Sequence, residues 1–256
     1  MISTFHTTTA IAGLLLALAA CGGEADEAAT STTTSAATAA AVTPVTPVTP
    51  GAAVAPARSA SPAQSKSTAG GAPRRVVLHG IDLTGIGYDD GNPNAPVVVV
   101  NFSDFGCPFC GTFARETYPT LAREFVGTGK VFFKYVPFVM GMFPNGEKAA
   151  RAAECAADQG KFSAMHDRLY ADQAAWKRGS SPVAVFQQAA SAIGLDLPRF
   201  DACYADGRTD PRTAAATDRA TRLGVRATPS FFVGDRLIEG ALPLEQFRAL
   251  LTEATR

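Results

Sequence analysis

The sequence lacks a surplus of charge of either sign. Its 256 residues contain 23 Lys and Arg against 23 Asp and Glu, so the formal net charge is zero. Nucleic-acid binding depends largely on basic side chains that neutralise phosphates, and this balance indicates no nucleic-acid partner. The chain also lacks any run of 18 or more apolar residues, which argues against a conventional membrane-spanning helix. The length permits one sizeable domain with extensions.

The first ten residues lack Lys and Arg, so the basic region that usually opens a signal peptide is missing. Ile11–Ala20 is nevertheless an apolar run of signal-peptide length. It ends in Leu18-Ala-Ala-Cys21, which resembles the bacterial lipobox, where the cysteine becomes the lipidated first residue of the mature chain. We predict a lipoprotein signal peptide over 1–20 and lipidation at Cys21. The alternative is an uncleaved hydrophobic tail with a chance cysteine.

Residues 22–72 contain no aromatic side chain and consist almost entirely of Ala, Thr, Ser, Pro and Gly. Such a composition cannot bury enough apolar surface to offset chain entropy, so we predict disorder over 21–72. The Thr-Pro repeat at Val42–Pro50 favours stiff polyproline geometry. This segment is expected to tether a folded domain, 73–256, to a lipid anchor at the bacterial cell envelope, outside the cytoplasm. The alternative is a low-complexity leader of no consequence.

Cys107 and Cys110 form a Cys-x-x-Cys pair that lacks the partners of a metal site. A structural zinc needs four ligands, and the remaining candidates form no second closely spaced pair: Cys155, Cys203, His79 and His166. Gly111 stands where a haem-attachment motif requires His. We therefore predict no metal and no cofactor. Redox chemistry is favoured over a metal site or a plain structural bridge.

The pair lies where a strand is expected to end and a helix to begin. Val97–Val100 is a continuous β-branched block, typical of a buried strand, and Pro108 suits the first position of a helix. Helical spacing follows in Phe109, Phe113, Leu121 and Phe125. The positive end of a helix dipole favours a thiolate, so the pKa of Cys107 should fall, with Cys110 one turn deeper. The chemistry predicted is thiol–disulfide exchange, in which Cys107 attacks and Cys110 resolves.

The remaining elements are expected in the order β-α-β, a block of helices, then β-β-α. A first strand is predicted at Arg75–His79, followed by a turn-rich stretch through Pro96, and Pro119 should kink the helix after Cys107. Strands are then predicted at Val131–Val136, Ser230–Val233 and Arg236–Glu239, and a closing helix at Leu244–Ala254. Between residues 145 and 223 only helices are predicted: Glu147–Gln159, Phe162–Tyr170, Val183–Ile193, Leu197–Tyr204, and a fifth that begins at Asp210 and ends at Gly224.

Three motifs in this order resemble the DsbA-like thiol–disulfide oxidoreductases of the thioredoxin superfamily. They are Asn94–Cys110, Glu154–His166 and Ala227–Gly234, and the resemblance extends from about Asp90 to the C-terminus. It implies an α/β thioredoxin fold with an all-helical insertion at about 145–223, and the activity of an extracytoplasmic thiol oxidoreductase.

The resemblance also implies roles for four further residues. Thr228-Pro229 matches the cis proline that faces the Cys-x-x-Cys in that family, with the backbone of Thr228 pairing with extended substrate; the alternative is a trans proline that starts a strand. Cys155 and Cys203 correspond to a second, structural disulfide of some relatives; the alternative is two buried free thiols.

Asp104 and Phe109 lie close in sequence to the two cysteines and are candidates for controlling their protonation and their oxidising strength. A carboxylate at Asp104 would relay the proton of buried Cys110; it would equally suit a solvated acid at a strand end or a helix cap. Phe109 stands where the strongly oxidising relatives carry His, which leaves the direction of exchange open.

We expect a monomeric enzyme that exchanges disulfides with client proteins carrying thiols or disulfides and with a membrane-bound or soluble redox partner. An isomerase or reductase is the alternative within the enzyme class. Isomerases of this superfamily usually dimerise through an added N-terminal domain, whereas the N-terminal segment of this chain is of low complexity. A non-catalytic peptide-binding module is the alternative outside the enzyme class, and it would need neither thiol.

Overall fold

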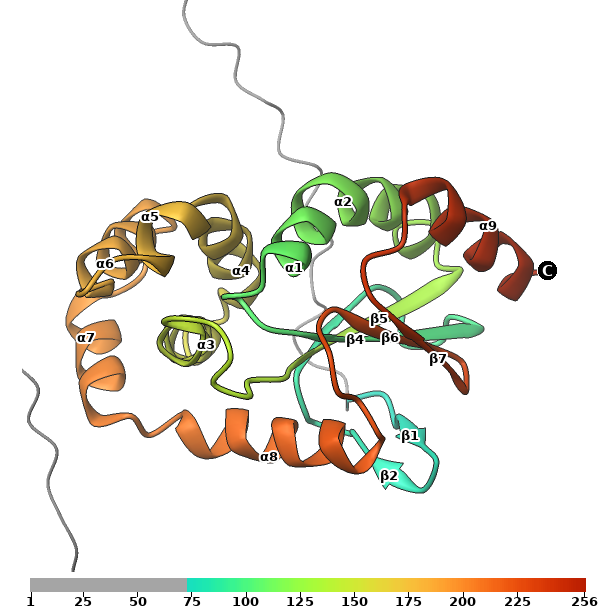
Figure 1. Ribbon diagram of the computed structural model, residues 1–256, viewed down its shortest axis with the longest axis horizontal. Helices are drawn as coiled ribbons and strands as arrows, with labels where there is room; N and C mark the ends of the chain where they lie inside the picture. The colour runs from blue at the N-terminus through green and yellow to red at the C-terminus, as the bar shows by residue number, and fades with distance from the viewer. Residues whose placement is uncertain (1–72) are drawn as a thin grey trace, which may run out of the picture. The chain divides into compact units, whose positions relative to one another are not determined.

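A five-stranded mixed sheet forms the centre of the folded part of the chain (Figure 1). The computed structural model describes residues 73–256, so the predicted signal peptide, Cys21 and the tether lie outside the described residues. The strand order is β3-β5-β4-β6-β7, with β4 and β5 parallel and the other neighbours antiparallel. The strands are β3 (Tyr88–Asp90), β4 (Val97–Ser103), β5 (Val131–Pro137), β6 (Ser230–Val233) and β7 (Arg236–Glu239).

Helices cover both faces of this sheet. On one face lie α1 (Pro108–Thr112), α2 (Tyr118–Leu121) and α9 (Leu244–Ala254). Aromatic rings fill the layer beneath them, with the Phe113 ring centroid 4.6 Å from that of Phe231. On the other face α8 (Asp210–Arg222) packs small side chains against larger ones from the strands: Ala216 and Ala220 against Val100, Phe102, Phe132 and Phe232. The sheet is therefore buried on both sides, which is why its central strands read as continuous apolar runs.

Five more helices form a block at the end of the sheet where β4 stops (Figure 1). They are α3 (Gly146–Ala157), α4 (Phe162–Ala171), α5 (Gln173–Lys177), α6 (Val183–Ala192) and α7 (Leu197–Asp206). Together with α8 they fill the chain between β5 and β6, so the predicted order of β-α-β, helices and β-β-α is confirmed. Within residues 73–256 no helix is both long and apolar enough to cross a membrane.

Pro119 does not break the helix that follows Cys107. Wide π-helical turns, η1 (Phe113–Thr117) and η2 (Ala122–Val126), flank α2 on either side. The N–H of Tyr118 reaches back five residues to the Phe113 carbonyl. π-helical turns and prolines are both places where helices commonly bend. The helix around Pro119 is therefore irregular in pitch, and the kink expected there stays a prediction.

The start of the domain differs from the prediction. The strand expected at Arg75–His79 is only β1 (Val77–Leu78), which pairs with β2 (Ile81–Asp82) in a ribbon outside the main sheet. The edge strand of the sheet is β3, which lies in the stretch predicted as turns. Two Asp residues give β3 a poor strand propensity, and tertiary contacts override it: Asp89 pairs with buried Lys134.

Gly87 explains how β3 approaches β5 so closely. Its φ is +69°, and a Cβ added there would lie 2.0 Å from the Tyr135 carbonyl oxygen. Glycine alone satisfies both the positive φ and the close backbone approach. The strand that sequence patterns missed therefore depends on the absence of one side chain.

Gly87→Ala should lower the free energy of unfolding by about 2 kcal/mol or more, because it adds a backbone clash to the strain of a positive φ. Gly85→Ala is the matched control, since Gly85 has the same φ of +69° but open space around its Cβ position. It should cost only about 1 kcal/mol. Urea denaturation of both variants measures the difference, and equal losses would contradict the close packing of β3 on β5.

Candidate active site

The two cysteines of the motif lie at the junction of β4 and α1. Cys107 is the N-cap residue of α1, with extended backbone angles of −74° and 123°, and Pro108 takes the first helical position. The sulfur of Cys107 accepts a hydrogen bond from the backbone N–H of Cys110 at 3.4 Å. A thiolate at this position serves as the helix cap, where unpaired N–H groups and the helix dipole favour negative charge.

The environment drives the two thiol pKa values apart. Hydrogen bonding from the Cys110 thiol, then from Thr228 and from backbone N–H groups, lowers the pKa of Cys107 to about 6, against desolvation. Burial, followed by the hydrogen bond and charge of Cys107, raises the pKa of Cys110 far above its ordinary value. Near neutral pH the thiolate form of Cys107 is therefore favoured, while Cys110 keeps its proton. Both cysteines are free thiols in the structure.

The loop before β6 faces this pair. The Thr228–Pro229 peptide bond is cis, and Cys107 in its thiol form donates from Sγ to the Thr228 carbonyl oxygen at 3.3 Å. The Thr228 hydroxyl is buried and has no hydrogen-bond partner among the described residues, so it is free to donate to Cys107 in its thiolate form. Pairing of Phe102 with Ser230 places Pro229 beside the end of β4. The structure thus brings together four of the residues that the sequence singled out.

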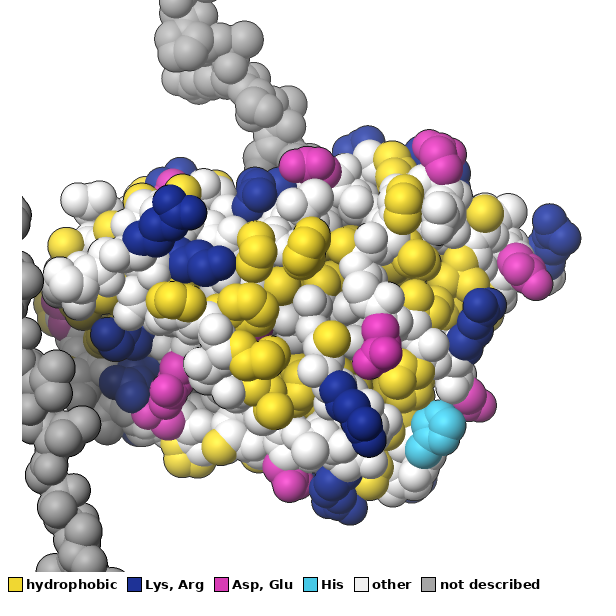
Figure 2. All heavy atoms as spheres, in the orientation of Figure 1, with side chains coloured by type: hydrophobic (Ala, Val, Ile, Leu, Met, Phe, Trp, Pro, Cys, Tyr) yellow, Lys and Arg dark blue, Asp and Glu magenta, His cyan; other side chains and the backbone are white. Residues whose placement is uncertain are grey.

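Access to Cys107 is restricted in this state. Its side chain has no exposed surface, whereas the neighbouring Phe109 is 66 % exposed. Reactive thiols are usually partly accessible, whereas Cys107 is fully enclosed in this state. Figure 2 shows apolar side chains spread over the middle of the visible face, with charged ones interspersed among them and along its edges.

Asp104 is buried at the end of β4, with only 2 % of its surface exposed. The solvated-acid interpretation is therefore wrong. Its Oδ1 atom accepts a hydrogen bond from the Gly106 N–H at 2.8 Å, so it caps the turn before α1 rather than α1 itself. Gly146 provides room for the carboxylate, because a Cβ there would lie 2.3 Å from Oδ1.

Burial is the main cause that raises the pKa of Asp104 to about 7. The hydrogen bond from Gly106 and the charge of Lys177 lower this pKa, and the negative charge of Cys107 raises it. The carboxylate and the Cys107 thiolate therefore repel each other. The backbone of Asp104 lowers the pKa of Cys110, and the proton relay through the Asp104 carboxylate stays a prediction.

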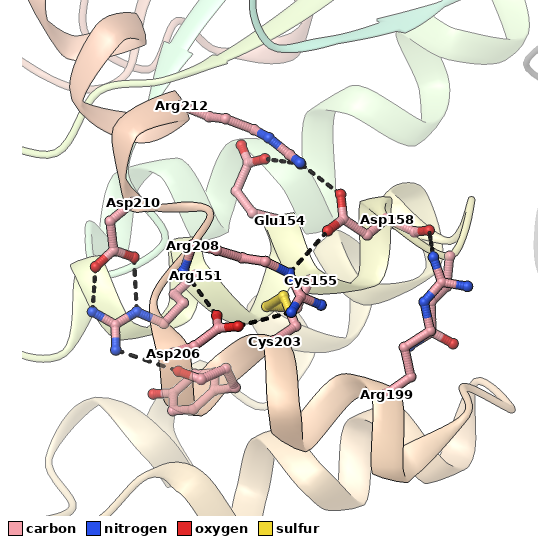
Figure 3. Close-up of a disulfide and its surroundings, with 12 residues drawn as sticks. Arg151, Glu154, Cys155, Asp158, Arg199, Cys203, Asp206, Arg208, Asp210 and Arg212 are labelled. Carbon is pink, nitrogen blue, oxygen red and sulfur yellow. Dashed lines mark hydrogen bonds and ion pairs between the residues drawn. A yellow bond between two sulfur atoms is a disulfide. The ribbon is translucent and has the colours of Figure 1, made fainter.

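Cys155 on α3 and Cys203 on α7 are joined by a disulfide with an S–S distance of 2.03 Å (Figure 3). Both are buried in the core of the helical block. Ion pairs tie the end of α3 to the chain that follows α7: Arg212 with Asp158 at 2.7 Å and Arg208 with Asp158 at 3.9 Å. This second pair of cysteines therefore belongs to the frame of the insertion and not to the Cys107 turn.

A family model described as Thioredoxin matches residues 87–253, which is more than half of the chain. The chain belongs to the thioredoxin family. Its fold is that of the DsbA branch: BdbD from Bacillus subtilis superposes with a TM-score of 0.62 over 72 % of this chain and 99 % of that one, at 20 % identity. Alpha-DsbA1 from Wolbachia pipientis gives a TM-score of 0.59 over 65 % and 89 %, at 21 % identity.

Curated relatives fall into two groups. The chain is 37 % identical over 164 residues to a protein named Na(+)/H(+) antiporter NhaA 1 from Salinispora arenicola, which covers 64 % of this chain but 24 % of that protein. The chain thus spans about a quarter of the length of the relatives it matches first. It is 29 % identical over 154 residues to the probable disulfide bond formation protein D of Bacillus anthracis, covering 57 % and 69 %.

Sequence reasoning missed one element that reaches this thioredoxin-family site, the short helix α5. Its first residue, Gln173, bonds the backbone of the Cys107 turn. The five residues of α5, Gln173–Lys177, are too few to show helical periodicity. The sequence signal for a role at the site is the polar amide of Gln173 followed by the apolar run Ala174–Trp176. Within residues 73–256 no group of three or more His, Cys, Asp or Glu side chains is placed to hold a metal ion.

Asp104→Asn should lower the pKa of Cys107 by up to about one unit, because it removes a negative charge beside the thiolate and keeps an acceptor for Gly106. The pH dependence of Cys107 alkylation in the Cys110→Ala background measures the pKa. Asp218→Asn, an exposed change on α8, is the control and should leave it unchanged. A higher pKa in Asp104→Asn would contradict the repulsion between the carboxylate and the thiolate.

Proposed function

We propose that this chain is an extracytoplasmic thiol–disulfide oxidoreductase that passes disulfides to client proteins through Cys107-Pro-Phe-Cys110. The observation that carries the proposal is the pairing of a thiolate that caps α1 with a buried, protonated neighbour. A stabilised thiolate favours the reduced form of the enzyme, and an enzyme whose reduced form is stabilised is an oxidant. The curated relative named for disulfide bond formation is consistent with this direction.

The reaction proceeds in two exchanges. A client thiolate attacks Cys107 Sγ of the oxidised enzyme, the Cys107–Cys110 bond breaks, and Cys110 leaves and takes up a proton. A second thiolate of the same client then attacks the client sulfur that is bonded to Cys107. Cys107 leaves as the stabilised thiolate. The client gains one disulfide and the enzyme becomes the dithiol of this structure. A redox partner that accepts two electrons restores the Cys107–Cys110 bond.

Client binding is assigned to the surface around the Thr228–Pro229 loop. The backbone of Thr228 would pair with an extended client segment, which tolerates many sequences because main-chain groups make the bonds. Three of the four large apolar side chains exposed within residues 73–256 support this surface: Phe109 lies on α1, and Met140 and Met142 lie in the loop that follows β5; the fourth, Val77, lies on β1. Phe143 of that loop lies against Gly106, which joins the loop to the site.

The location outside the cytoplasm rests on two features. The Cys155–Cys203 disulfide is of the kind that forms and persists in oxidising compartments. The apolar run that ends at Cys21 supports a lipid anchor at the bacterial cell envelope, followed by the 21–72 tether. We further propose that the enzyme acts as a monomer.

Cys107→Ser should abolish exchange, because it removes the sulfur that is attacked in the first exchange and leaves in the second. Cys110→Ser should instead accumulate mixed disulfides with clients, since the resolving thiol is gone. Non-reducing electrophoresis of envelope extracts and a peptide-oxidation assay measure the two effects. Cys155→Ala/Cys203→Ala, which leaves the site intact, is the control and should keep its exchange activity. Full activity of Cys107→Ser would identify the domain as a peptide-binding module or place the chemistry elsewhere.

Phe109→His should make the enzyme more oxidising. The pKa of the thiolate falls when an imidazolium lies beside it, and a lower pKa stabilises the reduced form at pH 7 and so raises the potential. The exposed position of Phe109 accepts the change without repacking the core. Equilibration with glutathione measures the potential, with Phe109→Leu as the uncharged control. An unchanged or lower potential in the His variant would leave the helix N-terminus and Thr228 as the main controls.

A further inference from the structure

The backbone of the active-site turn is held by a side chain from the helical insertion. Gln173, the first residue of α5, donates from Nε2 to the carbonyl oxygens of Phe105 at 2.6 Å and Cys107 at 2.9 Å. An amide nitrogen has two hydrogens, so both of its donors are used. Gln173 is only 8 % exposed, and these bonds bridge 68 and 66 residues of sequence.

These two carbonyls bracket the point where the chain changes from strand to helix. The Cys107 carbonyl also accepts from the Gly111 N–H at 3.2 Å, which is the first bond of α1. On the opposite side of the turn, Asp104 accepts from Gly106 and its carbonyl accepts from the N–H of Cys107. The peptide unit of the cap residue is therefore fixed from the sheet on one side and from the insertion on the other.

Gly111 makes this contact possible. A Cβ at that position would lie 2.8 Å from Gln173 Oε1 and 2.6 Å from Arg115 Nη1. Arg115 in turn donates to the Tyr170 carbonyl at 2.8 Å, near the end of α4. Because Gly111 has no side chain, Gln173 of α5 and Arg115, which bonds the end of α4, can both pack closely against the turn.

We propose that Gln173 is a positioning residue, which holds the Cys107 turn in the geometry that lets the Cys107 sulfur cap helix α1. Without these two bonds, the buried Phe105 carbonyl loses its side-chain donor and the Cys107 carbonyl keeps only the Gly111 N–H, so the peptide plane of Cys107 is less constrained. Rotation moves Cys107 Sγ away from the Cys110 N–H, so the thiolate loses part of its stabilisation. The inference rests on the proposed function for its importance, but the effect on Cys107 is measurable without any client.

Gln173→Glu tests this with almost no change in volume. A carboxyl group offers at most one donor in place of two and, when ionised, places a negative charge against two carbonyls. Gln173→Met, which also keeps the length of the side chain but removes both donors, is the second variant. The other charged or titratable groups around the turn, Asp104, Cys110, Lys177 and Arg115, remain as they are.

The readout is the rate of Cys107 alkylation by iodoacetamide as a function of pH, measured on the full chain. We expect the midpoint to rise by about one pKa unit in both variants, which corresponds to about fivefold slower alkylation at pH 6. Gln187→Glu and Gln187→Met are the matched controls, since exposed Gln187 on α6 bonds only Asp201. They should follow the wild-type pH profile.

A folded Gln173 variant with the wild-type midpoint overturns the proposal and leaves Gln173 as a packing residue. If one variant fails to fold, the other decides. If both fail, Gly111→Ala decides, because the added methyl displaces the Gln173 side chain while both donors are kept; an unchanged midpoint would again overturn the proposal. Shifted midpoints in an enzyme that oxidises no client would uphold the inference and defeat the proposed function, so the two outcomes are separable.

Discussion

The hydrogen bond from the backbone N–H of Cys110 to the sulfur of Cys107 is the interaction on which the rest of the site depends. This bond makes the Cys107 sulfur the N-cap of α1. The backbone N–H that the first turn of the helix leaves unpaired therefore also stabilises the thiolate. Everything around the junction supports that geometry: Thr228 lies across from the sulfur, Asp104 holds the turn from the sheet and Gln173 holds it from the insertion.

The opposite pKa shifts of the two cysteines follow from their depth in the fold. Cys107 gains donors that favour its charged form, and these outweigh the desolvation that opposes ionisation. Cys110 lies one turn further into the helix, where burial dominates and its own thiol serves as a donor to Cys107. Asp104 works against this arrangement, because a buried carboxylate beside a thiolate raises the cost of both charges. The oxidising strength of the site is therefore a balance and not the product of one group.

The parts that could be predicted from sequence are those that local pattern dictates. The β-branched run before Cys107, Pro108 after it and the spacing of the later phenylalanines fix a strand–helix junction without tertiary information. The strand β3 and the helix α5 could not be found in this way. β3 exists because Gly87 permits a close approach to β5, and α5 is defined by bonds from Gln173 to residues far away in the sequence. The burial of Asp104 was equally invisible, since it depends on Gly146 at the start of α3.

The reduction potential of the Cys107–Cys110 pair, measured by equilibration with glutathione, tests the oxidase assignment most directly. A thiolate stabilised by the start of α1 but opposed by Asp104, with Phe109 in place of an imidazole, predicts a value above that of thioredoxin, about −270 mV, and below that of DsbA, about −120 mV. A potential at or below about −270 mV would contradict the assignment and identify the protein as a reductase.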